Sequence, residues 1–141
     1  MKCDFCELDA KYIVHDGEVN FVCVRHLEEN FPQDPFEEIC SSRLFKAALD
    51  EAEKVLESLF AGKVVKFVHP RHPEVHWSYW DRSRDAFIER VVDSLNGEVC
   101  GSFEFRKLQT YLEILGKAIA NGWMPFETKL KPEQILNGGE R

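Results

Sequence analysis

Four residues near the N-terminus have the types and the spacing of a metal site. Cys3 and Cys6 are separated by two residues, and Cys23 and His26 repeat that spacing. Thiolate and imidazole groups in two such pairs are typical ligands of tetrahedral zinc. Four protein ligands leave no open position for a water molecule, so we predict one structural zinc ion and not a catalytic one.

Two alternatives to this ligand set stay open. The three cysteines could be reduced thiols in a small core beside an unrelated histidine. His15 could replace His26 as the fourth ligand, although its position next to Asp16 also explains it as a polar residue near a turn. Cys40 and Cys100 are left over, and we expect both thiols to be buried and unreactive.

The elements that must position these ligands can be predicted from the residues between the two pairs. Residues 10–15 and 18–22 are rich in β-branched and aromatic side chains, and Asp16 and Gly17 separate them. This pattern predicts a β-hairpin, because a tight turn needs the positive φ that Gly tolerates. One ligand pair would precede the hairpin and the other would follow it, where a helical turn could begin after His26.

A knuckle, a hairpin and ligands at the start of a helix resemble the treble-clef and zinc-ribbon families of small zinc modules. The resemblance covers about the first 30 residues and rests on Cys3, Cys6, Cys23 and His26. It implies a zinc-stabilised fold with these four residues as ligands, and it implies no particular activity.

The composition is that of a globular protein. The chain has 141 residues, of which 44% are hydrophobic and 30% charged, a balance that excludes disordered and fibrous classes. No apolar run reaches the roughly 20 residues that a membrane span needs, and no apolar leader follows Met1. We therefore expect a cytoplasmic protein without a membrane partner, whose cysteines bind metal or stay reduced.

The net charge of −7 is unevenly distributed along the chain. Residues 1–61 contain fourteen acidic against six basic side chains, whereas residues 62–84 contain five basic against two acidic ones. The acidic part would repel nucleic acid. A protein with a basic or mixed surface is the more natural partner.

Residues 31–60 predict a connection followed by a helix. Pro32 and Pro35 restrict the residues before them to extended conformations, so residues 31–40 are interpreted as a Pro-rich connection. Ser41 or Ser42 can cap a helix, and apolar residues then recur at spacings of three and four as far as Gly62. We expect this amphipathic helix to pack against the main core.

Residues 63–84 are basic and aromatic, and two β-rich runs at 63–68 and 74–80 predict a second hairpin. Tryptophan can stack on bases while Lys and Arg contact phosphates, so this hairpin could bind nucleic acid. The acidic remainder of the chain favours the alternative, a hairpin whose aromatic side chains pack on neighbouring helices. The candidate partner-binding residues are Lys63, Lys66, Arg71, Trp77, Trp80, Arg82 and Arg84.

The same segment contains three histidines. His69, His72 and His76 could bind a second metal and, with Asp81, form the site of a metal-dependent enzyme. Pro70 and Pro73 hold the intervening loop extended, however, and argue against a shared metal. No phosphate-binding loop, serine elbow or zinc-protease helix motif occurs in the chain.

The C-terminal part predicts two further helices. Asp81 or Ser83 would cap a helix that ends at Asn96, and Ser102 would cap another that ends at Asn121. The apolar residues 123–126 should break regular structure and lie against the core. One last helical turn should follow Pro132, and the end of the tail should then fray.

These observations predict an α+β protein. A zinc-knuckle segment (residues 1–30) and the connection (31–40) would precede a core domain (41–141) of helix, β-hairpin and two helices, all forming one compact unit. A closed zinc site and the absence of a catalytic motif favour a non-enzymatic regulatory or adaptor protein without catalytic residues. Its partner would be a protein such as RNA polymerase or other nucleic-acid machinery, as for small phage-encoded regulators of a host. Direct nucleic-acid binding and a metal-dependent enzyme are the alternatives.

Overall fold

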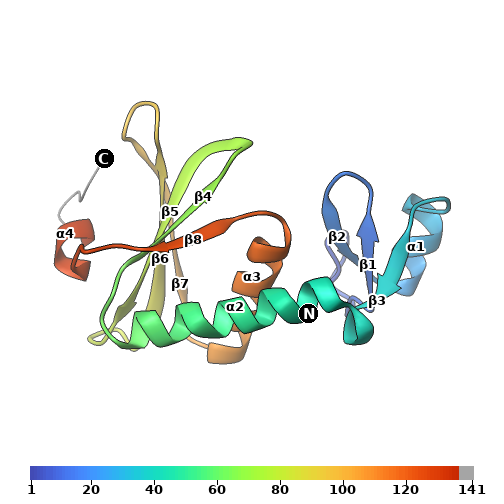
Figure 1. Ribbon diagram of the computed structural model, residues 1–141, viewed down its shortest axis with the longest axis horizontal. Helices are drawn as coiled ribbons and strands as arrows, with labels where there is room; N and C mark the ends of the chain where they lie inside the picture. The colour runs from blue at the N-terminus through green and yellow to red at the C-terminus, as the bar shows by residue number, and fades with distance from the viewer. Residues whose placement is uncertain (137–141) are drawn as a thin grey trace. The chain divides into compact units, whose positions relative to one another are not determined.

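The computed structural model describes residues 1–136, which form antiparallel sheets and a few helices (Figure 1). The chain divides into two compact units, residues 1–48 and the part from Leu49 onward. Helix α2 (Arg43–Phe60) begins in the first unit and continues into the second. None of the described helices is long and apolar enough to cross a membrane.

The first unit contains the hairpin predicted from sequence. Strands β1 (Tyr12–His15) and β2 (Val19–Val22) pair in antiparallel register around Gly17, whose φ of +94° explains the glycine. Helix α1 (Val24–Asn30) follows directly, so the second ligand pair lies at the start of a helix. The side chains of Cys3, Val14, Val22, Cys23 and Phe31 form the buried core of this unit.

The stretch interpreted as a connection also contains regular structure. Strand β3 (Phe36–Glu38) pairs with β1 and completes a three-stranded sheet of order β2-β1-β3, and a 3₁₀ turn, η1 (Ile39–Ser41), follows it. A three-residue strand lacks the alternating pattern that reveals longer strands, so its sequence did not predict it. Ser42 then caps α2 as expected, because its Oγ accepts a hydrogen bond of 3.2 Å from the backbone N–H of Phe45.

The second unit is built on a five-stranded antiparallel sheet of order β7-β6-β5-β4-β8 (Figure 1). Its strands are β4 (Val65–His69), β5 (His72–Asp81), β6 (Ala86–Asp93), β7 (Val99–Phe105) and β8 (Met124–Glu127). Helix α3 (Leu108–Ala120) connects the two edge strands, and the short helix α4 (Pro132–Leu136) ends the described chain.

The two faces of this sheet have separate cores. One face packs against α2 and α3, with Leu59 of α2 and Tyr111 of α3 fully buried between Val65 and Phe87 of the sheet. The opposite face has a smaller core, formed by Val64, Trp77, Tyr79, Ala86 and Ile88, against which Leu130 packs.

The predicted helix from Asp81 to Asn96 is wrong, because β6 occupies its place. The apolar run over residues 86–92 suits either structure, but Phe87 is buried on one face of the sheet and Ile88 on the other. Strand β5 supplies a partner for each residue of β6. Asp81 does not cap a helix and instead accepts hydrogen bonds from Ser83 and Arg84 in the turn between the strands.

Two other predictions for the C-terminal half also need correction. Residues 102–105 belong to strand β7, so α3 begins at Leu108 and not at Ser102, although it ends where predicted. Residues 124–127 form strand β8, which pairs with β4, instead of irregular structure. We predicted a helix, a hairpin and two helices for this part of the chain. It consists instead of helix α2, a four-stranded meander (β4 to β7), helix α3 and strand β8, which pairs with β4. The part of the tail that was expected to fray, residues 137–141, lies outside the described residues.

Candidate metal centre

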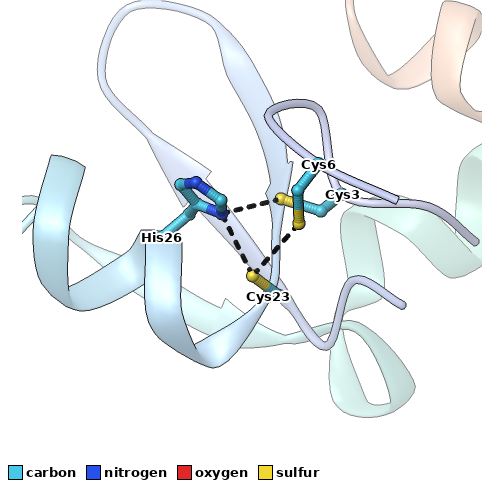
Figure 2. Close-up of side chains that lie close together, drawn as sticks. All are labelled: Cys3, Cys6, Cys23 and His26. Atoms are coloured by element: carbon cyan, nitrogen blue, oxygen red, sulfur yellow. Dashed lines mark hydrogen bonds between the residues drawn. The ribbon is translucent and has the colours of Figure 1, made fainter. Parts of the chain in front are cut away.

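The four predicted ligands come together in the first unit. The ligating atoms of Cys3, Cys6, Cys23 and His26 all lie within 4.8 Å of one another (Figure 2). The Sγ atoms of Cys6 and Cys23 are 3.7 Å apart, and His26 Nδ1 lies 3.2 Å from Cys23 Sγ and 3.7 Å from Cys3 Sγ. A tetrahedron with metal–sulfur bonds near 2.3 Å has edges of about 3.8 Å. The arrangement therefore has the size of a tetrahedral metal site.

Local backbone structure explains how the first ligand pair is held. The backbone N–H of Cys3 donates to the carbonyl of Leu8 at 2.8 Å, which closes the loop that carries Cys3 and Cys6. Within this loop the N–H of Phe5 points at Cys3 Sγ at 3.4 Å. This contact helps to orient the Cys3 side chain toward the other three residues of the cluster.

The second ligand pair is positioned by helix α1. Cys23 is the N-cap residue of α1, and His26 lies in its first turn, so their side chains point to the same side (Figure 2). The backbone N–H of His26, followed by its side chain, lowers the pKa of Cys23 to about 6. At neutral pH Cys23 is therefore mostly a thiolate, the form that metals bind.

The pKa of Cys6 is shifted in the opposite direction from the pKa of Cys23. The backbone N–H of Leu8 lowers the pKa of Cys6, but burial and the neighbouring thiols outweigh it and raise that pKa overall. Adjacent negative charges cannot all be stabilised without a cation. The cluster could therefore hold a metal ion, and three thiolates with one imidazole are a donor set of the kind that zinc binds.

The surroundings bury two of the four ligands, while Cys6 and His26 are partly exposed. Cys3 and Cys23 are only 5% exposed, and the ring of Phe5 packs against His26 and Phe31 at centroid distances of 5.8 and 5.6 Å. His15, the alternative fourth ligand, lies away from the cluster, where its Nε2 is 3.4 Å from a carboxylate oxygen of Glu37. Contrary to expectation, Cys40 and Cys100 are both exposed.

The seven candidate partner-binding residues do not form one surface. Lys66 lies over the ring of Trp77 at 5.4 Å, whereas Trp80 faces the other side of the sheet and contacts Phe60 and Phe87. Lys63 forms an ion pair with Glu127 at 3.1 Å. Arg71 lies in the turn before β5, and Arg82 and Arg84 lie in the turn after it, so they are at opposite ends of that strand.

The three histidines of the second unit surround an indole instead of sharing a metal-sized space. The ring centroids of His69, His72 and His76 lie 5.2, 5.3 and 4.6 Å from Trp123. Both ring nitrogens of His69 are engaged, Nδ1 by the N–H of Arg71 and Nε2 by the carbonyl of Asn121, and Nδ1 of His76 contacts Glu89 at 2.9 Å. Asp81 lies at the far end of β5.

Over residues 1–136, Cys3, Cys6, Cys23 and His26 are the one set of three or more Cys, His, Asp or Glu side chains whose ligating atoms lie close enough to share a metal ion. An open pocket of about 430 Å³ lies near the turn between β5 and β6, and Trp80 and Arg82 line it. Its charges balance, since Arg82 and Lys131 face Asp81 and Glu133. It therefore has no electrostatic preference for one class of ligand.

The chain matches no known family model, and no curated protein or solved structure is significantly similar to it.

Proposed function

We propose that this protein is a zinc-stabilised regulatory or adaptor protein that binds another protein and catalyses no reaction itself. The observation that carries the proposal is the closed donor set of Cys3, Cys6, Cys23 and His26. Three sulfurs and one nitrogen occupy all four coordination positions of a tetrahedral zinc ion, so no position remains for a substrate or an activated water molecule.

The charge of the chain supports a protein partner. The first 61 residues carry fourteen acidic and six basic side chains, and three bound thiolates with a neutral imidazole would leave the zinc centre at −1. Such a surface repels phosphates and complements a basic protein. Nucleic-acid machinery exposes basic surfaces of this kind, which makes RNA polymerase the first partner to test.

The proposal is tested with the full chain loaded with zinc. Elemental analysis should give about one zinc per chain in a reduced preparation. Affinity capture from a cell lysate, with and without nuclease treatment, should recover the same stoichiometric protein, and the purified pair should bind in calorimetry. Recovery that disappears after nuclease treatment would favour nucleic-acid binding instead. Failure to recover any stoichiometric protein would contradict the proposal.

A further inference from the structure

Strand β7 is an open edge of the five-stranded sheet. The sheet order is β7-β6-β5-β4-β8, so β7 pairs with β6 on one side only. Within the described part of the chain, the backbone–backbone hydrogen bonds of residues 99–105 all belong to this one ladder. The N–H and C=O groups that point away from β6 are therefore available to another strand.

The two edges of this sheet are protected to different extents. The β8 edge contains Pro125, which has no N–H to offer a further strand. Strand β7 contains no proline, lysine or arginine, and its one charged residue, Glu104, pairs with Arg106 at 3.2 Å. A register shift at Cys100 interrupts the start of β7 and leaves a regular run over residues 101–105. Along this run β7 lacks the devices that usually protect an edge strand from pairing.

Apolar side chains are exposed along the same edge. Val99 at the start of β7 is 49% exposed, Phe103 in its middle is 53% exposed, and Leu108 just after it is 50% exposed. Exposed apolar side chains that are grouped on one element, and not scattered singly, mark an interaction surface. The β7 edge therefore offers apolar contacts as well as backbone groups.

Unpaired charges of opposite sign lie at the two ends of this strand. Glu98 precedes β7 and Lys107 follows it, and both residues are exposed. Within residues 1–136 neither side chain has an ion-pair or hydrogen-bond partner. Nine positions of extended chain span about 30 Å, so these two groups cannot pair within one copy of the chain.

We propose that β7 pairs with β7 of a second copy of this chain, in antiparallel register about a two-fold axis. The regular run over residues 101–105 is centred on Phe103, so the two Phe103 side chains lie opposite each other at the axis. Ser102 of one copy then lies opposite Glu104 of the other, and no like charges face each other in the run. The two sheets become one continuous sheet across the axis.

The same register also pairs the end charges. Glu98 of one copy comes within one position of Lys107 of the other, and the two-fold axis repeats this ion pair. Both charges that cannot pair within one copy thus gain a partner in the dimer. The inference goes beyond the proposed function, because it concerns two copies of this chain and not the other protein that the chain binds.

Sedimentation velocity of the zinc-loaded full chain, from about 5 to about 500 μM, measures the association. The wild type should dimerise as its concentration rises. Phe103→Lys places two like charges opposite each other at the axis and should weaken dimerisation by about tenfold. Leu95→Lys is the matched control, because Leu95 is 84% exposed in the turn before β7, and it should dimerise within about twofold of the wild type.

Exchange of the end charges tests the register. Glu98→Lys and Lys107→Glu should each weaken dimerisation by about threefold, because each variant replaces two ion pairs by two like-charge contacts. The double variant restores opposite charges and should recover the affinity of the wild type within about twofold. All of these positions lie outside the metal cluster, so zinc content should stay the same.

A disulfide provides a second measure of the same geometry. Cys40 and Cys100 are exposed, so both are first replaced by serine. In this background Phe103→Cys should form a disulfide-linked dimer under mild oxidation, because opposed residues of antiparallel strands bring their Cβ atoms about 5 Å apart. Leu95→Cys, the control, should stay monomeric.

Three outcomes would overturn the inference. A chain that stays monomeric at the highest concentration would leave the β7 edge to a strand of another protein. A dimer that Phe103→Lys does not weaken would be formed through another surface. Single charge variants that weaken the dimer, with a double variant that does not recover it, would contradict the antiparallel register.

Discussion

The two units of this protein are stabilised in different ways. In the first unit two of the five core residues, Cys3 and Cys23, belong to the cluster that could hold a metal ion. In the second, the main core consists of aliphatic and aromatic side chains from α2, α3 and the two strands β4 and β6. A unit of fewer than 50 residues buries little apolar surface, and a metal ion bound at this cluster would supply additional free energy of folding.

Removal of the metal is the strongest way to separate the two units. Cys23→Ser, or chelation of the wild type, should unfold the first unit, because metal binding supplies on the order of 10 kcal/mol to such modules. Hydrogen exchange of the full chain should show lost protection in β1 and β2 and retained protection in β4 to β6. Cys40→Ser is the matched control, since Cys40 is exposed and outside the cluster. Unchanged protection in β1 and β2 would contradict the assigned role of the metal.

A substitution that creates a cavity in the core of the second unit should destabilise that unit and leave the metal cluster intact. Leu59 is fully buried in the main core, so Leu59→Ala should lower the free energy of unfolding by about 2–5 kcal/mol. Urea denaturation measures this loss, and zinc content should stay the same. The control is Leu95→Ala, which should change stability by less than about 0.5 kcal/mol because Leu95 is 84% exposed. A parallel loss of zinc in Leu59→Ala would show that the units are not independent.

A buried hydrogen bond links α3 to the sheet in the second unit. The Tyr111 hydroxyl donates to Ser78 Oγ at 3.0 Å, and both side chains are buried. Tyr111→Phe leaves Ser78 without this partner and should cost about 1–3 kcal/mol, whereas the double variant with Ser78→Ala should recover part of that loss. Thermal unfolding of the single and double variants checks the expectation, and additive losses would contradict it.

The burial of Tyr111 predicts a loss of stability at alkaline pH. Burial raises the pKa of Tyr111 far above its ordinary value of 10.0, so the native state keeps the proton that the unfolded chain releases. Stability should therefore decrease as pH rises above about 10. Tyr111→Phe should show a smaller decrease than the wild type in urea titrations at pH 9 to 11, and identical slopes would count against this burial.

The smallest effect is expected at the turn between β5 and β6. The Ser83 hydroxyl, with the backbone N–H groups of Ser83 and Arg84, lowers the pKa of Asp81 below its ordinary 3.8. A depressed carboxyl pKa contributes stability above the unfolded pKa, and this contribution is lost as pH falls below about 4. Asp81→Asn should cost about 1 kcal/mol at pH 7 and nothing measurable at the lowest pH where the protein folds. A cost that does not change with pH would contradict this role of the carboxylate.

Local sequence signals were sufficient for the metal cluster, the hairpin of β1 and β2, and α2, although they missed β3 in the first unit. Two ligand pairs, a turn glycine and a capping serine each act within a few residues, so the metal cluster, the hairpin of β1 and β2 and the helix could be predicted without tertiary information. They failed between residues 81 and 105, because a run of β-branched and aromatic residues suits a strand or a helix equally well. Pairing with the neighbouring strand β5 decided that residues 86–93 form a strand and not a helix.

The sequence by itself determined the candidate metal ligands, because their chemistry depends on residue type and on a spacing of two residues. Only the tertiary structure decided which charged and aromatic residues share a surface. Side chains alternate between the two faces of β5, so Trp80 and Trp77 lie on opposite faces of the sheet. Strand pairing places Lys66 on the same face as Phe126 and Arg90, which lie 60 and 24 positions further along the chain. Strand pairing is a long-range event, so no local pattern in the chain records which residues it brings side by side.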